Sequence, residues 1–245
     1  MTRKQYFLSG LKDGMPICFG YFAVSFAFGI QAAGIGLSVF EASVLSALNV
    51  TSAGQFAALA IIASGASLIE LAFTQLIINL RYFLMSCALS QKLSPSLPLG
   101  YRLGIAYGMT DEIFAVSVSQ REPLSPFYSY GLIAVAIPGW VLGTALGAAA
   151  GNILPAVLTN ALGIAIYGMF IAIILPPAKE NRVVAGVVVL SMVLSALFTY
   201  LPVLCNISSG FRIIVITLIT AGGAALLFPI PDEPAEPEKE MPHES

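Results

Sequence analysis

Residues 127–150 read FYSYGLIAVAIPGWVLGTALGAAA, and no charged side chain interrupts these 24 positions. A helix that crosses the hydrocarbon core of a bilayer needs about 20 mainly apolar residues, so this run is long enough to span it. Comparable apolar runs fill most of the chain. In order, the runs cover residues 14–36, 42–64, 67–90, 101–119, 127–150, 154–176, 183–204 and 211–229. The pattern predicts an all-α, polytopic transmembrane helix bundle of about seven or eight spans.

The composition supports a membrane protein and excludes several classes of function. Hydrophobic residues make up 58% of the 245 positions and charged residues only 10%, against roughly one quarter charged in an average soluble domain. The mean hydropathy is +0.89. So little polar surface excludes soluble catalysis and nucleic-acid binding. The only histidine, His243, lies in the acidic tail, which also excludes histidine-dependent membrane enzymes, so we expect no enzyme, no cofactor and no metal site.

The chain divides into three segments by composition. Residues 1–13 are a basic amino terminus, residues 14–229 are the transmembrane part, for which we argue a transport role below, and residues 230–245 are an acidic tail. The tail is rich in Pro and Glu, a composition that cannot bury enough apolar surface to fold, so we expect it to be disordered.

A weak internal repeat runs through the transmembrane part. Residues 54–59 (GQFAAL) resemble residues 168–173 (GMFIAI), at an offset of 114 positions. Transporters are often built from two repeats with the substrate site between them. The segments 14–120 and 127–229 are therefore candidate halves.

Lys and Arg are enriched on the cytoplasmic side of membrane proteins, and this rule sets the expected orientation. Arg3, Lys4 and Lys12 place the amino terminus in the cytoplasm. Eight crossings then put the other basic residues on two sides: Arg121, Lys179 and Arg182 inside, and Lys92, Arg102 and Arg212 outside. The run 101–119 is the weakest, because residues 110–112 interrupt it, and a broken or re-entrant helix is the alternative to a crossing there.

Four glycines recur at four-residue spacing in the fifth run, at Gly139, Gly143, Gly147 and Gly151. This spacing places them on one stripe of a helix, where a neighbouring backbone can approach closely. We interpret the stripe as a helix-packing surface.

Small and polar residues gather within the second run, at what should be membrane depth: Asn49, Thr51, Ser52, Gly54 and Gln55. Glycine weakens a helix, and Ser, Thr and Asn can satisfy the backbone groups that a break leaves free. We therefore expect unwound backbone that lines a cavity. In this interpretation Gln55 and the backbone around Gly54 bind the carboxylate and ammonium groups of a zwitterion. Ordinary hydrogen bonding between helices is the alternative.

Charged and amide side chains interrupt the third run at Glu70, Asn79 and Arg81. Glu70 and Arg81 lie about 16 Å apart along a helix axis, so they cannot pair with each other. Arg81 lies deep in its run and needs a partner, for which Asp111, Glu112 or an anionic group of a substrate are the candidates. Asn79 is a candidate for substrate binding. Glu70 is either a coupling carboxylate or a solvated group near a helix end.

Asp111 and Glu112 are carboxylates within the fourth run. An ionisable residue inside a membrane is a functional candidate by default, and either acid could take up and release a proton during a transport cycle. The alternative is that residues 110–112 start a helix, where their side-chain oxygens accept hydrogen bonds from free backbone amides.

Four short segments, taken in their order along the chain, resemble the AzlC family of branched-chain amino acid permeases: residues 53–56 (AGQF), 79–81 (NLR), 110–112 (TDE) and 165–172 (AIYGMFIA). The resemblance extends over about residues 10–229. It implies an exporter of leucine, isoleucine and valine in the cytoplasmic membrane, driven by the proton motive force. It also implies a small AzlD-type membrane subunit encoded as a separate chain.

These observations favour a secondary transporter that exports branched-chain or related apolar amino acids by alternating access. Two alternatives stay open, a non-transporting membrane subunit or scaffold and a carrier for another small solute. A scaffold has little reason to keep charges at membrane depth.

Overall fold

The computed structural model describes residues 2–120, 123–151, 153, 171, 174–201, 204 and 207–228. Apart from an isolated bridge between Leu93 and Leu124, its regular elements in these residues are helical. They are α1 (Arg3–Gly34), α2 (Val39–Leu48), α3 (Ser52–Ala63), α4 (Leu68–Lys92), α5 (Leu99–Tyr107), α6 (Asp111–Val118), α7 (Pro126–Gly151), α9 (Arg182–Tyr200), α10 (Ser209–Thr217), the π-helical turn η1 (Leu218–Gly222) and α11 (Gly223–Leu227). The predicted all-α membrane fold is confirmed.

Five helices in the described part of the chain are long and apolar enough to cross a membrane. They are Arg3–Gly34, Leu68–Lys92, Pro126–Gly151, Arg182–Tyr200 and Gly210–Leu227. The expected count of seven or eight spans is not confirmed. Most of the sixth run lies outside the described residues, and the second and fourth runs are each broken into two short helices.

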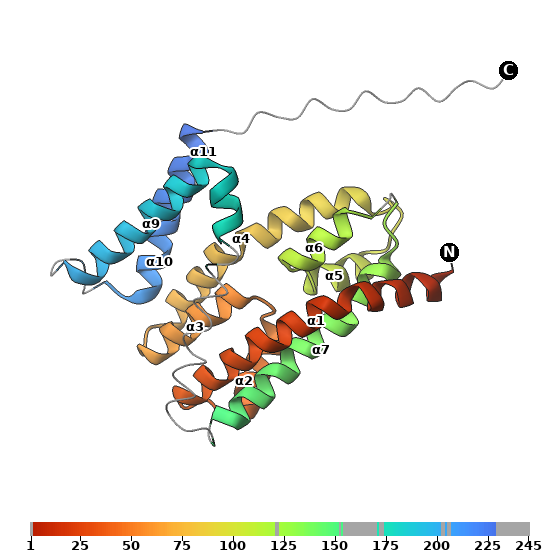
Figure 1. Ribbon diagram of the computed structural model, residues 1–245, viewed down its shortest axis with the longest axis horizontal. Helices are drawn as coiled ribbons and strands as arrows, with labels where there is room; N and C mark the ends of the chain where they lie inside the picture. The colour runs from red at the N-terminus through yellow and green to blue at the C-terminus, as the bar shows by residue number, and fades with distance from the viewer. Residues whose placement is uncertain are drawn as a thin grey trace.

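Helices α1 and α7 run parallel and side by side, and they define the two ends of the bundle (Figure 1). Gly10 near the start of α1 packs on Gly131 near the start of α7, and Gly151 at the end of α7 packs on Ile30 near the end of α1. We call the end that holds Arg3 the amino-terminal end and the other the distal end.

The second run forms a helical hairpin, α2 and α3, that enters from the distal end and returns to it. Ala42 of α2 and Leu59 of α3 pack in one buried cluster with Ala148, close to the end of α7. The chain turns at residues 49–51, between the two legs. The expected interruption of this run is therefore present, and the chain turns back there toward the distal end.

The fourth run forms a second hairpin, α5 and α6, that enters from the amino-terminal end. Arg102 Nη2 in α5 donates to the carbonyl oxygen of Ser94 at 3.0 Å, just after α4. Lys92 Nζ at the end of α4 donates to the carbonyl oxygen of Val118 at the end of α6, at 2.6 Å. Both legs of this hairpin therefore start or finish beside the end of α4, and the re-entrant alternative is the correct one.

The first six helices place two hairpins in opposed directions. Helix α1 ends at the distal end and is followed by a hairpin that enters there, and α4 ends at the amino-terminal end and is followed by a hairpin that enters there. The ends of α2 and α5 meet where Tyr107 Oη donates to the carbonyl oxygen of Ala47 at 2.5 Å, and the Tyr107 side chain is exposed there. The sequence match between residues 54–59 and 168–173 relates different segments, and most of its second copy lies outside the described residues.

The hairpins correct the expected positions of two basic residues. Lys92 and Arg102 lie at the amino-terminal end, with Arg3, and not on the opposite side from it. The prediction was wrong because it counted runs 42–64 and 101–119 as crossings, whereas a re-entrant hairpin returns the chain to the side it came from. Arg212, in the first turn of α10, lies near the start of α4 at the distal end.

The glycine stripe of α7 lies directly against α1. A Cβ built on Gly139 would stand 2.5 Å from Cys18 Sγ, and one built on Gly151 would stand 3.1 Å from the Ala33 Cβ. Built on Gly143 or Gly147, the same atom would meet the backbone of Phe22 or Phe26. The backbones of the two helices are therefore in contact along most of their length, as in other small-residue interfaces.

Candidate functional site

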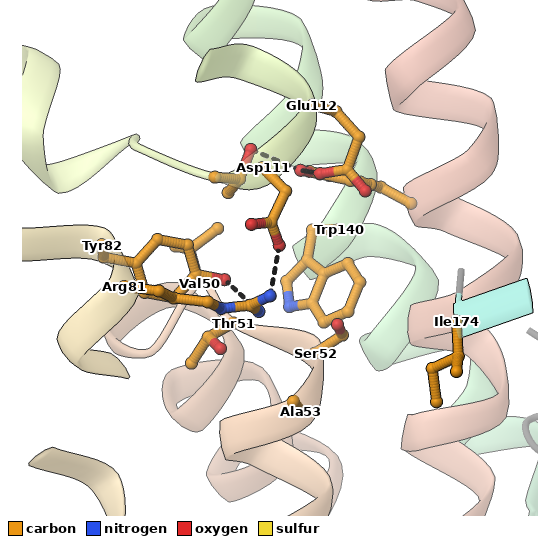
Figure 2. A pocket seen from close by; sticks show the side chains of 12 residues that line it. Val50, Thr51, Ser52, Ala53, Arg81, Tyr82, Asp111, Glu112, Trp140 and Ile174 are labelled. Atoms are coloured by element: carbon orange, nitrogen blue, oxygen red, sulfur yellow. Dashed lines mark hydrogen bonds and ion pairs between the residues drawn. The ribbon is translucent and has the colours of Figure 1, made fainter. Parts of the chain in front are cut away.

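A cavity of about 210 Å³ lies where the tips of the two hairpins approach α4, α1 and α7 (Figure 2). Its lining comes from several segments that are far apart in the chain. The lining residues are Tyr21, Val50, Thr51, Ser52, Ala53, Arg81, Tyr82, Thr110, Asp111, Glu112, Trp140 and Ile174.

Each hairpin tip ends in a threonine that starts the returning helix. Thr51 is extended and its hydroxyl accepts from the Gly54 N–H at 3.4 Å, while the Thr110 hydroxyl accepts from the Ile113 N–H at 3.3 Å. A Thr in this position satisfies one of the free amides of a helix start. Consequently the amino ends of both α3 and α6 face the same cavity.

The two helix starts differ in charge. The first turn of α3 has no acidic residue, whereas the first turn of α6 contains Asp111 and Glu112. A helix amino terminus carries a partial positive charge, which nearby carboxylates offset. The α6 side of the cavity is therefore acidic, and the α3 side presents helix-start amides without a neighbouring anion.

Arg81 bridges α4 and α6 across the cavity (Figure 2). Its Nη1 forms an ion pair with Asp111 Oδ2 at 2.8 Å, and the two side chains are 41% and 47% exposed. Nη2 donates to the Tyr82 hydroxyl at 3.2 Å, and the guanidinium carbon lies 4.9 Å from the centre of the Tyr82 ring. Of the partners that the sequence left open, the structure selects Asp111.

Glu112 is held by a hydroxyl group instead of a cation. The Tyr21 hydroxyl donates to Glu112 Oε2 at 2.5 Å and lies 2.5 Å from the Thr110 hydroxyl oxygen. The Tyr21 ring packs edge-on against Trp140, with ring centres 5.4 Å apart and planes at 76°. In the described residues the Glu112 carboxylate forms no ion pair.

Gln55 lies behind the cavity wall instead of in its lining. Its side chain is fully buried, with Oε1 accepting from Trp140 Nε1 at 2.8 Å and Nε2 donating to Ser46 Oγ at 2.9 Å. Ser46 in turn shares a hydrogen bond of 2.6 Å with Thr144 of α7. With both ends of its amide engaged, Gln55 fixes the orientation of Trp140 and joins the first hairpin to α7.

Asn49, Gly54 and Asn79 meet around Gln75 beside the tip of the first hairpin. Gln75 Oε1 accepts from Asn49 Nδ2 at 3.1 Å and from Asn79 Nδ2 at 3.2 Å, and its Nε2 donates to the Gly54 carbonyl oxygen at 2.8 Å. This cluster ties the unwound tip to α4. Of the predicted binding residues, Thr51, Ser52 and Arg81 line the cavity. Asn49, Gly54 and Asn79 do not line it, and they hold the tip of the first hairpin in place through Gln75.

Comparison with known proteins places this architecture in a family. A family model described as AzlC protein matches residues 16–154, more than half of the chain. The chain belongs to the AzlC family. It is 35% identical over 189 residues to an uncharacterized membrane protein of Archaeoglobus fulgidus, covering 76% of this chain and 83% of that one. It is also 31% identical over 184 residues to the inner membrane protein YgaZ of Escherichia coli, covering 72% and 75%. No solved structure matches the chain.

The AzlC match covers every cavity residue except Ile174. Several lining residues were not assigned from the sequence, notably Tyr21, Val50, Ala53 and Trp140. One feature of the sequence could have drawn attention to Trp140. It is the only tryptophan in the chain, and it stands between Gly139 and Gly143 of the glycine stripe. Among the described residues, no group of three His, Cys, Asp or Glu side chains lies close enough to hold a metal ion.

Glu70 lies outside the cavity in this AzlC-family chain. It is buried, and its Oε1 accepts from the Gly210 N–H at 2.8 Å, in the first turn of α10. A carboxylate at a helix amino terminus stabilises that helix. Glu70 therefore fastens α10 to the start of α4.

We expect Glu70→Ala to lower the free energy of unfolding by roughly 2 kcal/mol, because it removes a charge-assisted hydrogen bond from a buried helix start. Thermal unfolding in detergent measures the change. Thr74→Val is the matched control one turn further along α4, because the buried Thr74 hydroxyl has no hydrogen-bond partner among the described residues. Equal stability of Glu70→Ala and the unmodified protein would contradict the anchoring role.

Proposed function

We propose that this chain is a secondary transporter that exports branched-chain or related apolar amino acids across the cytoplasmic membrane, driven by the proton motive force. The AzlC family is generally associated with amino acid transport. The proposal takes the cavity between the hairpin tips as the substrate site.

The observation that carries the proposal is the charge difference between the two helix starts at the cavity. The α3 start offers the N–H groups of Ser52 and Ala53 with no acidic neighbour in its first turn, which suits a carboxylate. The α6 start offers Asp111 and Glu112, which suit an ammonium group. A zwitterionic amino acid has both groups, a short distance apart.

The size and remaining lining of the cavity support a small apolar substrate. A volume of about 210 Å³ is below the roughly 300–1,000 Å³ of typical drug-sized ligand sites. Val50, Ala53, Trp140 and Ile174 add apolar surface beside the charged groups. A single amino acid with an aliphatic side chain matches this combination.

The distribution of basic residues in the first seven helices supports a cytoplasmic location of the amino-terminal end. Within residues 2–151 as described, Lys and Arg occur at the amino-terminal end and at Arg81 inside the bundle, and the distal loops 35–38 and 64–67 contain none. Under the positive-inside rule the amino-terminal end faces the cytoplasm. The tips of the two hairpins then reach the substrate site from opposite sides of the membrane.

Opposed hairpins provide a means of alternating access. Each tip covers the cavity from one side, so movement of one hairpin at a time would expose the site to one compartment and then to the other. A small AzlD-type membrane subunit, encoded separately, completes the proposed transporter. A scaffold without transport activity gives no role to the Arg81–Asp111 pair or to the cavity.

Leucine counterflow tests the function directly. Proteoliposomes preloaded with unlabelled leucine should accumulate labelled leucine transiently when they contain this chain together with a small membrane partner found beside its gene. The chain alone and empty liposomes are the controls. A pore would equilibrate label without accumulation. Absence of uptake with folded protein in both preparations would argue against leucine, and a screen of other small solutes would follow.

A further inference from the structure

We infer that Glu112 is a shared exchange site, whose carboxylate holds either the ammonium group of the substrate or one proton, but not both. The inference rests on the proposed function and specifies how transport is coupled to protons. It separates the roles of two adjacent acids, Asp111 and Glu112, that the sequence treats alike.

The two acids differ in their partners. Asp111 is neutralised by Arg81 at 2.8 Å, so its charge is already balanced before a substrate arrives. Glu112 accepts a hydrogen bond from the Tyr21 hydroxyl and has no cation partner in the described residues, so the amino end of α6 is the group that offsets its charge. A carboxylate without a counterion that faces a cavity can pair with a cationic group of a substrate or take up a proton.

The geometry leaves one side of Glu112 free for such a partner. Oε2 accepts from Tyr21, while Oε1 has no hydrogen bond among the described residues, and Glu112 lines the cavity. The titratable and charged groups that face it are Tyr21 from α1, Asp111 from α6, and Arg81 and Tyr82 from α4 across the cavity. From α3 and α7 it faces Ser52 and Trp140, which do not titrate (Figure 2).

Competition at one carboxylate produces antiport. On the cytoplasmic side a zwitterion binds protonated Glu112, the proton leaves to water, and the carboxylate pairs with the substrate ammonium group. On the outer side the substrate leaves and the carboxylate takes up a proton. Each cycle moves one neutral zwitterion out and one proton in, so both the pH gradient and the membrane potential drive export.

Proton release on binding tests the inference. Leucine is added to the full-length protein with its small partner in weakly buffered detergent solution, a pH indicator counts released protons, and calorimetry counts bound leucine. We expect close to one proton per leucine at acidic pH, falling to zero as the pH rises. Isocaproate, which is leucine without its amino group, should release none.

Variants at the two acids and at Tyr21 locate the site. Glu112→Gln should abolish pH-dependent proton release, whereas Asp111→Asn should retain it. Tyr21→Phe keeps the ring on Trp140 and removes the donor that stabilises the ionised carboxylate, so half-maximal release should move to higher pH. If Glu112→Gln does not fold, Tyr21→Phe still tests the assignment to Glu112. An unchanged pH dependence of proton release in that variant would overturn it.

The outcomes separate this inference from the proposed function. Leucine binding without proton release in the unmodified protein, or release that persists in Glu112→Gln, would overturn the shared site and leave amino acid transport standing. Absence of any leucine binding by calorimetry would overturn the amino acid substrate, and the shared site with it.

Discussion

Replacing Arg81 with Ala should lower transport roughly 30-fold while the protein still inserts and folds. The change removes the 2.8 Å partner of Asp111 and leaves a carboxylate without a counterion inside the bundle. An unpaired charge at the centre of a membrane costs about 3 kcal/mol. Both side chains are partly exposed to the cavity, and water there reduces the cost to about 2 kcal/mol, which corresponds to roughly 30-fold in rate. The measurement is the initial rate of counterflow per quantity of folded protein.

A second substitution distinguishes charge balance from direct substrate contact. If Arg81 acts mainly by neutralising Asp111, the double variant Arg81→Ala, Asp111→Asn should recover most of the lost rate, because the amide at position 111 carries no charge that needs a counterion. Arg81→Lys, which keeps the charge but loses the planar contact with Tyr82, should fall between them. A double variant as slow as Arg81→Ala would instead assign the substrate carboxylate to Arg81.

The sequence located both breaks in the helices but not the path of the chain through them. Polar and small residues at 49–55 and the acids at 110–112 indicated interruptions, and both tips lie there. A crossing helix of about 20 residues and two antiparallel legs of about ten have the same hydropathy, so composition cannot separate them. Residues 110–112 indicated a helix start, which the structure confirms at α6, yet they do not indicate the direction of that helix.

The contacts that define the cavity could not be found from local patterns. Tyr21 reaches Glu112 across 91 positions, and Trp140 reaches Gln55 across 85. Gln55 looks like a ligand in the sequence because it is polar and lies at membrane depth. Only the three-dimensional structure shows that both ends of its amide are hydrogen-bonded, to Trp140 and to Ser46. For Arg81 the sequence was a better guide. An unpaired arginine inside a membrane is energetically unfavourable, and the sequence contains few acidic residues that could pair with it, one of which is Asp111.

The glycine stripe of α7 carries the second large expected effect, because substitutions there act on the contact between α1 and α7. At Gly147 an added Cβ would meet the carbonyl group of Phe26, with the carbonyl carbon at 2.7 Å and the Cα at 2.9 Å. These atoms belong to a helix backbone and cannot turn aside as a side chain can. Gly147→Ala must therefore push the two helices apart, which we expect to cost about 3 kcal/mol and a large part of the folded protein.

A graded series of Gly→Ala variants makes the prediction specific. Gly20 of α1 has nothing within 4 Å of an added Cβ, so Gly20→Ala should be neutral or stabilising by up to about 1 kcal/mol through helix propensity alone. Gly151→Ala, with contacts from 3.1 Å, should cost little, and Gly139→Ala, which meets the Cys18 Sγ and carbonyl oxygen, should be intermediate. Melting temperatures in detergent should fall in the order Gly20, Gly151, Gly139, Gly147. A stable Gly147→Ala variant would mean that α1 and α7 do not approach this closely in the membrane. The cavity between α1, α7 and the hairpin tips would then have a volume larger than about 210 Å³.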